Sequence, residues 1–172
     1  MSRNALTAAV IAVLAVVAGT VSAAAASPPA RPTAAKPTTL TFDVVFSPLH
    51  LIAANNVRNP KSPIALGDEI VEHDQLFSRG QHVGDDMFSC VIVSAPPAAP
   101  LANCTAIFRL PGGNITAQTP AIPGPAPKDL ALTGGTGTYR NIGGDGTLVE
   151  FGPVKGKLTL HVLSLVARGG GA

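Results

Sequence analysis

Three features are missing from the sequence, and each absence argues against one class of fold or function. Lysine and arginine are few and scattered, with 12 basic against 10 acidic residues and a net charge of +2. A nucleic-acid-binding surface needs clustered basic side chains, so we expect no nucleic-acid partner. No long apolar run follows the first 26 residues, so we expect no stable membrane insertion. Helical periodicity is also hard to find beyond those residues, which argues against a helical fold.

The first 26 residues have the composition of a secretory signal peptide. Arg3 gives the N-terminal segment a positive charge, residues 5–18 are almost wholly apolar, and small residues follow. This order predicts cleavage near residues 24–26 and export, which places the mature chain outside the cell. Four prolines then predict a disordered linker over 27–38. One domain is expected over 39–166, with a flexible tail over 167–172.

After the linker, apolar and polar residues alternate as in half-buried β-strands. Leu40, Phe42, Val44 and Phe46 share one face, and Asp43 falls on the other. We expect seven or eight antiparallel strands and an irregular region over 48–63. Because no helix is long enough to cover a sheet, closure into an all-β barrel is favoured, since closure removes exposed strand edges.

Two cysteines give the best evidence for strand pairing. A hairpin centred on Pro97 sets Cys90 directly opposite Cys104 and Phe88 opposite Ala106. In an exported chain we expect this pair to be oxidised to a disulfide. The alternative is a redox or nucleophilic cysteine.

Two further turns predict the other registers. The Pro-Gly-Gly-Asn turn sets Leu110 opposite Ile115 and keeps the face that carries both cysteines apolar across three strands. The last turn, around Gly152, sets Glu150 opposite Lys157 as a cross-strand charge pair.

Glycine is concentrated in residues 130–147, where it makes up six of 18 positions. Leu130, Leu132, Tyr139 and Ile142 are threaded between the glycines, which a flexible linker would not require. The pattern predicts turns with positive φ and close backbone approach between short strands.

Several motifs, in the right order, resemble those of plant allene oxide cyclases and dirigent proteins. They occupy residues 65–68, 75–78 with 83–84, 88–90, 113–118 and 134–137. The resemblance spans about residues 39–163 and implies an eight-stranded antiparallel β-barrel with a central cavity. It also implies a small hydrophobic ligand, no cofactor, and a homo-trimer, with a homo-dimer as the alternative.

The resemblance extends only partly to the cyclase chemistry. Plant cyclases use a first-strand acidic residue, asparagines and a Ser-Pro pair to position an allylic epoxide and a water. Asp43 falls near the acidic position, whereas Val45 and Ile64 stand where the family has asparagine. Ser47-Pro48 comes several residues early, and the charged pair that dirigent proteins place around the Gly-Gly-Thr-Gly turn is missing.

Asp43 is the candidate catalytic residue, and Phe42, Arg109 and Tyr139 are the candidate ligand-binding residues. A carboxyl group in an apolar cavity is easily protonated and could protonate a leaving oxygen. The alternative for Asp43 is a solvated residue alternating along a strand. Arg109 and Tyr139 could donate to an anionic or carbonyl ligand, against surface placement as the alternative for Arg109.

Other polar groups carry weaker signals. The acidic run over 68–74 matches no recognised ligand spacing, so we expect no metal and favour a solvated edge strand there. No set of nucleophile, histidine and acid emerges. Glycosylation patterns begin at Asn103 and Asn114, and we expect neither to be modified.

Two functions stay open on this basis. In the first, a secreted barrel binds a small hydrophobic molecule and steers its cyclisation or coupling, as an isomerase or cyclase without a redox cofactor. In the second, a non-catalytic exported barrel serves in binding or surface interaction. Asp43 is retained without its helper residues, which leaves enzymatic activity undecided.

The leader gives the first testable prediction. Expression in a secreting host should release a chain shortened at residues 24–26, because the charged, apolar and small-residue segments follow the order that signal peptidase requires. Intact-mass measurement of the extracellular protein checks this. A secreted chain that still carried residues 1–18 would contradict it.

Overall fold

The strands of the chain form a single antiparallel sheet that closes on itself. The computed structural model describes residues 37–54, 64–95, 100–122 and 124–164. Nine strands and one short 3-10 helix are present in these ranges: β1 (Thr38–Val45), β2 (His50–Ile52), β3 (Glu69–Ser78), β4 (Gln81–Ser94), β5 (Leu101–Leu110), β6 (Gly113–Ala121), β7 (Lys128–Gly135), η1 (Gly137–Tyr139), β8 (Ile142–Glu150) and β9 (Lys155–Ser164).

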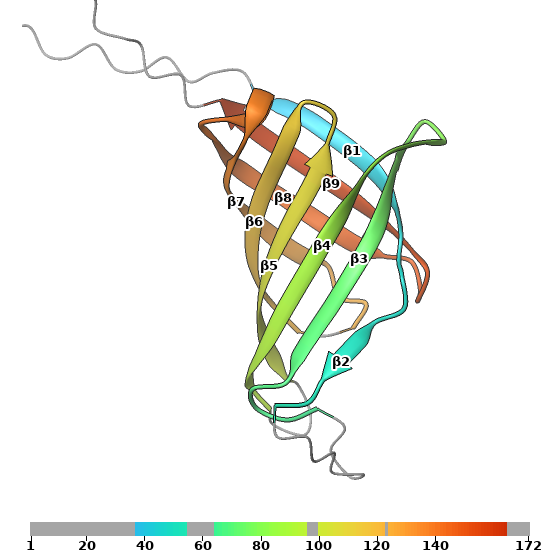
Figure 1. Ribbon diagram of the computed structural model, residues 1–172, viewed down its shortest axis with the longest axis vertical. Coiled ribbons are helices and arrows are strands. Elements are labelled where there is room, and N and C mark those ends of the chain that lie inside the picture. Colours follow the sequence, from blue (N-terminus) through green and yellow to red (C-terminus); the bar gives the residue numbers. More distant parts are fainter. Residues whose placement is uncertain (1–36, 55–63, 96–99, 123, 165–172) are drawn as a thin grey trace, which may run out of the picture. The chain divides into compact units, whose positions relative to one another are not determined.

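Eight of these strands make a closed barrel. The sheet order is β1-β9-β8-β7-β6-β5-β4-β3, and β1 also pairs with β3, which closes the ring (Figure 1). The short β2 pairs with the other part of β3, inside the region predicted to be irregular. The eight-stranded antiparallel β-barrel predicted from the sequence is therefore confirmed.

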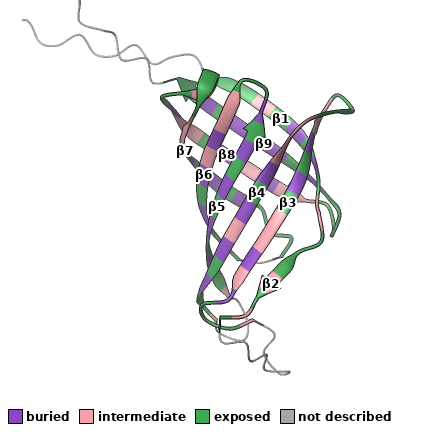
Figure 2. Ribbon diagram, viewed as in Figure 1, coloured by how far each residue is buried: buried purple, intermediate pink, exposed green. Residues whose placement is uncertain are grey.

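Alternating side chains fill the barrel interior. Along β5, every second residue is buried and the residues between are exposed, and the other strands alternate similarly (Figure 2). In β1, Phe42 and Val44 are buried as predicted. The largest fully buried apolar side chains are Phe108, Leu76, Ile92, Ile115, Leu158, Leu160 and Val44.

The register of the cysteine hairpin is as predicted. Cys90 pairs with Cys104 across β4 and β5, and Phe88 pairs with Ala106. The two cysteines form a disulfide with their Cα atoms 4.0 Å apart. Both are buried, so the bond belongs to the inner surface of the barrel.

The next hairpin differs from its prediction by two residues. Ile115 pairs with Phe108 rather than Leu110, because the turn between β5 and β6 is tighter than expected. Gly112 supplies the positive φ of +92° that this turn requires. A shift of two residues leaves every side chain on its predicted face, so the apolar face survives the error.

The last hairpin differs by one residue, and the predicted Glu150–Lys157 pair is wrong. Lys157 pairs with Val149, because the Phe151 N–H donates to the Lys155 carbonyl at 2.7 Å and shortens the turn. A one-residue slip moves side chains to the opposite face. Phe151, predicted to continue the apolar face, is accordingly 65% exposed.

The glycine-rich stretch forms β7, η1 and most of β8, with turns where they were expected. Gly137 has a φ of +60°, and a Cβ there would lie 2.0 Å from the Gly112 carbonyl oxygen. A Cβ on Gly113 would lie 2.1 Å from the Thr136 carbonyl oxygen. Two turns thus approach each other more closely than side chains allow, which explains the glycine at these positions.

The predicted signal peptide over 1–26, most of the linker over 27–38 and the tail over 167–172 lie outside the described residues. Thr38, the last residue of the predicted linker, already belongs to β1. Within the described ranges, no helix has the length and apolar character needed to span a membrane.

Removal of the disulfide tests its contribution to stability. The Cys90→Ala/Cys104→Ala double variant should lose about 3 kcal/mol of unfolding free energy, because the bond closes a short loop and restricts the unfolded chain. Urea unfolding of both proteins measures this loss. Thiol labelling of unfolded, unreduced wild-type protein is the control, and two labelled cysteines would contradict the disulfide.

Candidate functional site

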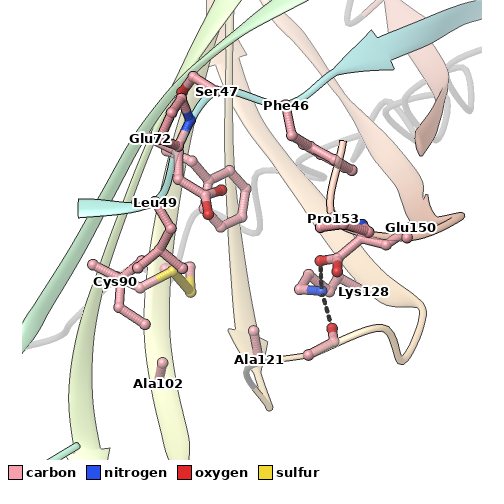
Figure 3. Close-up of a pocket in the computed structure, with 16 residues that line it drawn as sticks. Phe46, Ser47, Leu49, Glu72, Cys90, Ala102, Ala121, Lys128, Glu150 and Pro153 are labelled. Carbon is pink, nitrogen blue, oxygen red and sulfur yellow. Dashed lines mark hydrogen bonds and ion pairs between the residues drawn. A yellow bond between two sulfur atoms is a disulfide. The ribbon is translucent and has the colours of Figure 1, made fainter. Parts of the chain in front are cut away.

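A cavity of about 400 Å³ occupies one end of the barrel interior. Its wall is largely apolar and includes the Cys90–Cys104 disulfide. Figure 3 shows Cys90 and Leu49 on one side of the cavity and Lys128 and Glu150 on the other. The lining residues are Phe46, Ser47, Pro48, Leu49, Ile70, Glu72, Phe88, Cys90, Ala102, Cys104, Ala121, Gly124, Lys128, Glu150, Gly152 and Pro153.

The cavity lies at this end because inward-facing side chains are larger elsewhere. On β5, Ala102 and Cys104 line the cavity, whereas Phe108 further along the strand is 2% exposed and fills the barrel. On β3, Ile70 and Glu72 line it, and Leu76 further along is completely buried. Small residues at one end and large ones at the other leave space at a single end.

A break between β1 and β2 forms part of the wall. Both strands pair with β3, but Pro48 lacks an N–H and interrupts the ladder between them. Ser47 bridges the gap: its backbone N–H donates to Asp74 Oδ1 at 2.7 Å and its hydroxyl to the same oxygen at 3.2 Å. The Ser47 hydroxyl also accepts the His73 N–H at 3.2 Å. Side-chain hydrogen bonds thus replace backbone pairing beside the cavity.

Glu72 is the carboxyl group that faces the cavity from β3. Burial, followed by the neighbouring charges of Asp74 and Glu150, raises the pKa of Glu72 from its usual 4.5 to about 7, and Lys128 acts in the opposite direction. The side-chain carboxylate of Glu72 has no hydrogen-bond or ion-pair partner among the described residues. At neutral pH it can therefore either give or take a proton, as a general acid or base requires.

Two aspartates lie one inward position further along the strands. Asp74 and Asp86 are direct partners across β3 and β4 and are 3% and 4% exposed. Burial raises the pKa of Asp74, while the Ser47 hydrogen bonds lower it. Burial, followed by the charge of Asp74, raises the pKa of Asp86 to about 7. Asp86 Oδ1 is buried and has no hydrogen-bond partner among the described residues.

Lys128 and Glu150 form an ion pair on the opposite wall. The Lys128 ammonium group also donates to the Gly124 carbonyl at 2.7 Å and the Ala126 carbonyl at 3.4 Å. A buried lysine needs such compensation, because removing its charge from water is costly. The side chain of Lys128 is only 9% exposed.

The prediction that Asp43 lies inside the cavity is wrong. Asp43 is exposed on the outer face of β1 and borders surface depressions beside Lys157 and Phe77. The alternation predicted for this strand is confirmed, and its polar face points to solvent. We therefore do not place the acid of the site at Asp43.

The predicted ligand-binding residues are also outside the cavity lining. Phe42 is buried in the barrel core and does not line the cavity. Arg109 is exposed and forms a bidentate ion pair with Asp85, with both N–O distances 2.5 Å. The Tyr139 hydroxyl donates to the Pro111 carbonyl at 3.4 Å, beside η1. Of the predicted functional residues, only Cys90 and Cys104 line the cavity, and there they form a structural bond.

The sequence prediction missed the carboxyl groups that do face inward. The acidic run was assigned to a solvated edge strand, but barrel closure leaves β3 without a free edge. Glu72 and Asp74 lie at even-numbered positions between Ile70 and Leu76, which both face the core. This period of two was the available signal. Within the described ranges, no three histidine, cysteine or acidic side chains are placed to hold a metal ion.

The structure is a closed antiparallel barrel with an interior, mostly apolar cavity. Several solved structures share this architecture. A pyocyanin demethylase is 27% identical, with a TM-score of 0.64, and the match covers 73% of this chain and 99% of that protein. A pterocarpan synthase dirigent protein is 17% identical, with a TM-score of 0.58 over 75% of this chain and 90% of that one.

The third structure is the Diels–Alderase AbmU from Streptomyces koyangensis. It is 15% identical, with a TM-score of 0.60 over 74% of this chain and 64% of that protein. No protein-family model and no curated protein sequence matches the chain. The chain thus has the barrel fold of the dirigent and cyclase proteins, and the resemblance predicted from the sequence is confirmed at the level of fold.

The raised pKa of Glu72 makes stability depend on pH. In the unfolded chain Glu72 ionises near its ordinary pKa, so in the fold its ionisation costs stability as the pH rises toward 7, and the full cost is present above that pH. Glu72→Gln removes this cost. Relative to wild type, the variant should therefore gain about 1–3 kcal/mol between about pH 5 and about pH 8.5.

Urea unfolding at the two pH values measures this gain. Asp129→Asn is the matched control, because Asp129 is an exposed carboxylate on the outer face of β7. The control should differ from wild type equally at both pH values. An equal difference for Glu72→Gln would contradict the raised pKa of this half-buried carboxyl group.

Proposed function

We propose that the chain binds a small, largely apolar molecule in the barrel cavity and steers its cyclisation or coupling. The observation that carries this proposal is the apolar cavity of about 400 Å³ with one unpaired carboxyl group, Glu72, on its wall. Cavities of this size and lining are typical of small-ligand sites. The polar groups are few, so they would orient the ligand while apolar contacts provide most of the affinity.

Glu72 is the residue to which we assign the chemistry. Its pKa of about 7 lets it exist in both protonation states under physiological conditions. It could protonate a leaving or carbonyl oxygen, or remove a proton from a bound ring. The apolar walls, including Phe46 and Phe88, would hold the reacting atoms together and exclude water.

Solved structures of the same fold support the proposed cyclisation or coupling, although they do not bear on Glu72 itself. By their names, the dirigent protein is a pterocarpan synthase and the Streptomyces protein catalyses a Diels–Alder reaction. The 27% identity to a pyocyanin demethylase, over nearly all of that protein, makes pyocyanin the first specific molecule to test as a ligand. We propose that the mature chain acts outside the cell, which the disulfide supports because such bonds persist in oxidising compartments.

A non-catalytic binding barrel is the second candidate. Asp43, the acidic residue expected for cyclase chemistry, lies on the outer face, which favours binding without turnover by the cyclase route. The two candidates share the cavity and differ in whether Glu72 transfers a proton. The homo-trimer or homo-dimer implied by the sequence resemblance stays a prediction.

Filling the cavity tests both candidates. Ala102 is 1% exposed and lines the cavity, so a phenylalanine there should occupy the ligand's space. We expect Ala102→Phe to weaken binding of N-phenyl-1-naphthylamine, a neutral fluorescent probe, by at least about tenfold. Fluorescence titration measures the affinity.

Asn103→Phe is the matched control, because Asn103 is the next residue on β5 and faces outward. It should leave the affinity within about twofold of wild type. Ala121→Phe provides a second filling variant if Ala102→Phe fails to fold. Absence of binding to wild-type protein, or equal binding to all variants, would contradict a ligand site in the barrel.

A further inference from the structure

We propose that the cavity selects cationic ligands, namely a flat apolar skeleton that carries a positive charge, with the Glu72 carboxylate as its counter-ion. This inference rests on the proposed function, because it names the class of molecule that the same cavity takes. It follows from which charged groups around the cavity already have hydrogen-bond or ion-pair partners and which do not.

The positive charge on the cavity wall is already paired with acceptor groups of the protein. Lys128 has three ammonium protons and three acceptors: the Glu150 carboxylate and the carbonyls of Gly124 and Ala126. An anionic ligand would have to compete with all three. Lys128 is the basic residue among the described lining residues, so a bound anion would meet no free cation there.

The negative charge of the Glu72 carboxylate is not paired in this way. Glu72 lines the cavity and has no hydrogen-bond or ion-pair partner among the described residues. Figure 3 shows its carboxylate directed into the cavity, on the side opposite Lys128 and Glu150. A ligand cation in the space between would therefore meet one unpaired carboxylate. Since an unpaired charge that is partly removed from water is costly, a cation that pairs with Glu72 would relieve that cost.

Two further carboxyl groups lie in the barrel interior beyond the residues that line the cavity. Asp74 and Asp86 occupy the next inward positions after Glu72 on β3 and Phe88 on β4. Asp86 is 4% exposed, and its Oδ1 atom has no hydrogen-bond partner among the described residues. Like the Glu72 carboxylate, this oxygen receives no hydrogen bond from the described residues around it. No basic side chain from β5 or β6 compensates, because the lining residues there are Ala102, Cys104 and Ala121.

Because Glu72 titrates near neutral pH, the affinity of the cavity for a cation should depend on pH. Burial contributes most to the raised pKa of Glu72, Asp74 on β3 and Glu150 on β8 raise it further, and Lys128 on β7 lowers it. Asp86 on β4 is electrostatically coupled to Glu72, and Asp85 on the outer face is paired with Arg109 and His73. As the pH rises through about 7, Glu72 loses its proton and should attract a cation more strongly. Affinity for a neutral ligand should not rise.

Two probes of nearly equal shape test the charge preference. N-methylacridinium is a flat cation, and N-methylacridone is a neutral analogue that differs by a carbonyl oxygen. At about pH 8 we expect wild-type protein to bind the cation at least about tenfold more tightly than the neutral probe. The cation's affinity should fall at least about threefold between about pH 8 and about pH 6, while that of the neutral probe stays constant.

Glu72→Gln keeps the shape of the side chain and removes its charge. It should abolish both the preference and the pH dependence, while N-methylacridone binds within about threefold of its wild-type affinity. Glu69→Gln is the matched control on the same strand, since Glu69 faces outward and bonds Ser89. The control should keep the preference. The pH series on wild-type protein provides the test even if Glu72→Gln fails to fold.

The outcomes separate this inference from the proposed function. Equal binding of the two probes would overturn the charge preference and leave a ligand site in place. A preference that persists in Glu72→Gln would overturn the assignment of the counter-ion. Binding of neither these probes nor N-phenyl-1-naphthylamine would overturn the proposed function itself.

Discussion

The closure of the sheet between β1 and β3 is the contact on which the rest of the structure depends. Three residues of β1, from Asp43 to Val45, pair with β9 on one side and with β3 on the other. This short seam turns an open sheet into a barrel and gives every strand an inner face. Directly after these strand residues, Ser47 and Pro48 no longer take part in the hydrogen-bonded ladder, and both line the cavity. Closure and cavity are thus two consequences of the same short pairing.

The charged side chains inside the barrel differ in how many hydrogen bonds and ion pairs compensate their burial. Asp74 accepts two hydrogen bonds from Ser47, and Lys128 is surrounded by three acceptors, so both are stabilised in place. Among the described residues, the Glu72 carboxylate has no such partner, and Asp86 has only a backbone hydrogen bond from Asp74, so burial raises the pKa of each to about 7. Uncompensated carboxyl groups are rarely kept in a barrel core for stability alone, and perturbed groups concentrate where chemistry or binding takes place.

The fold alone does not assign a reaction. Structures that share this barrel are named for a demethylase, a dirigent protein and a Diels–Alderase, with identities from 15% to 27%. Since the strands are common to all of them, specificity has to come from the residues that line the interior. In this chain those residues are apolar side chains, a disulfide, an internally satisfied ion pair and Glu72.

The sequence by itself predicted most of the strands, the alternation of their side chains between two faces and the disulfide. Alternation along β1 and β5 follows from side chains only two positions apart, and the Cys90–Cys104 register follows from one local turn. It did not determine the register at Gly152, because one residue more or less in a turn exchanges the faces and leaves composition unchanged. Which carboxyl group enters the cavity was decided only by the tertiary structure. Asp43 and Glu72 both sit on alternating strands, but barrel closure turns the face with Asp43 outward and encloses Glu72 with Lys128 and Glu150, more than 50 residues away in sequence.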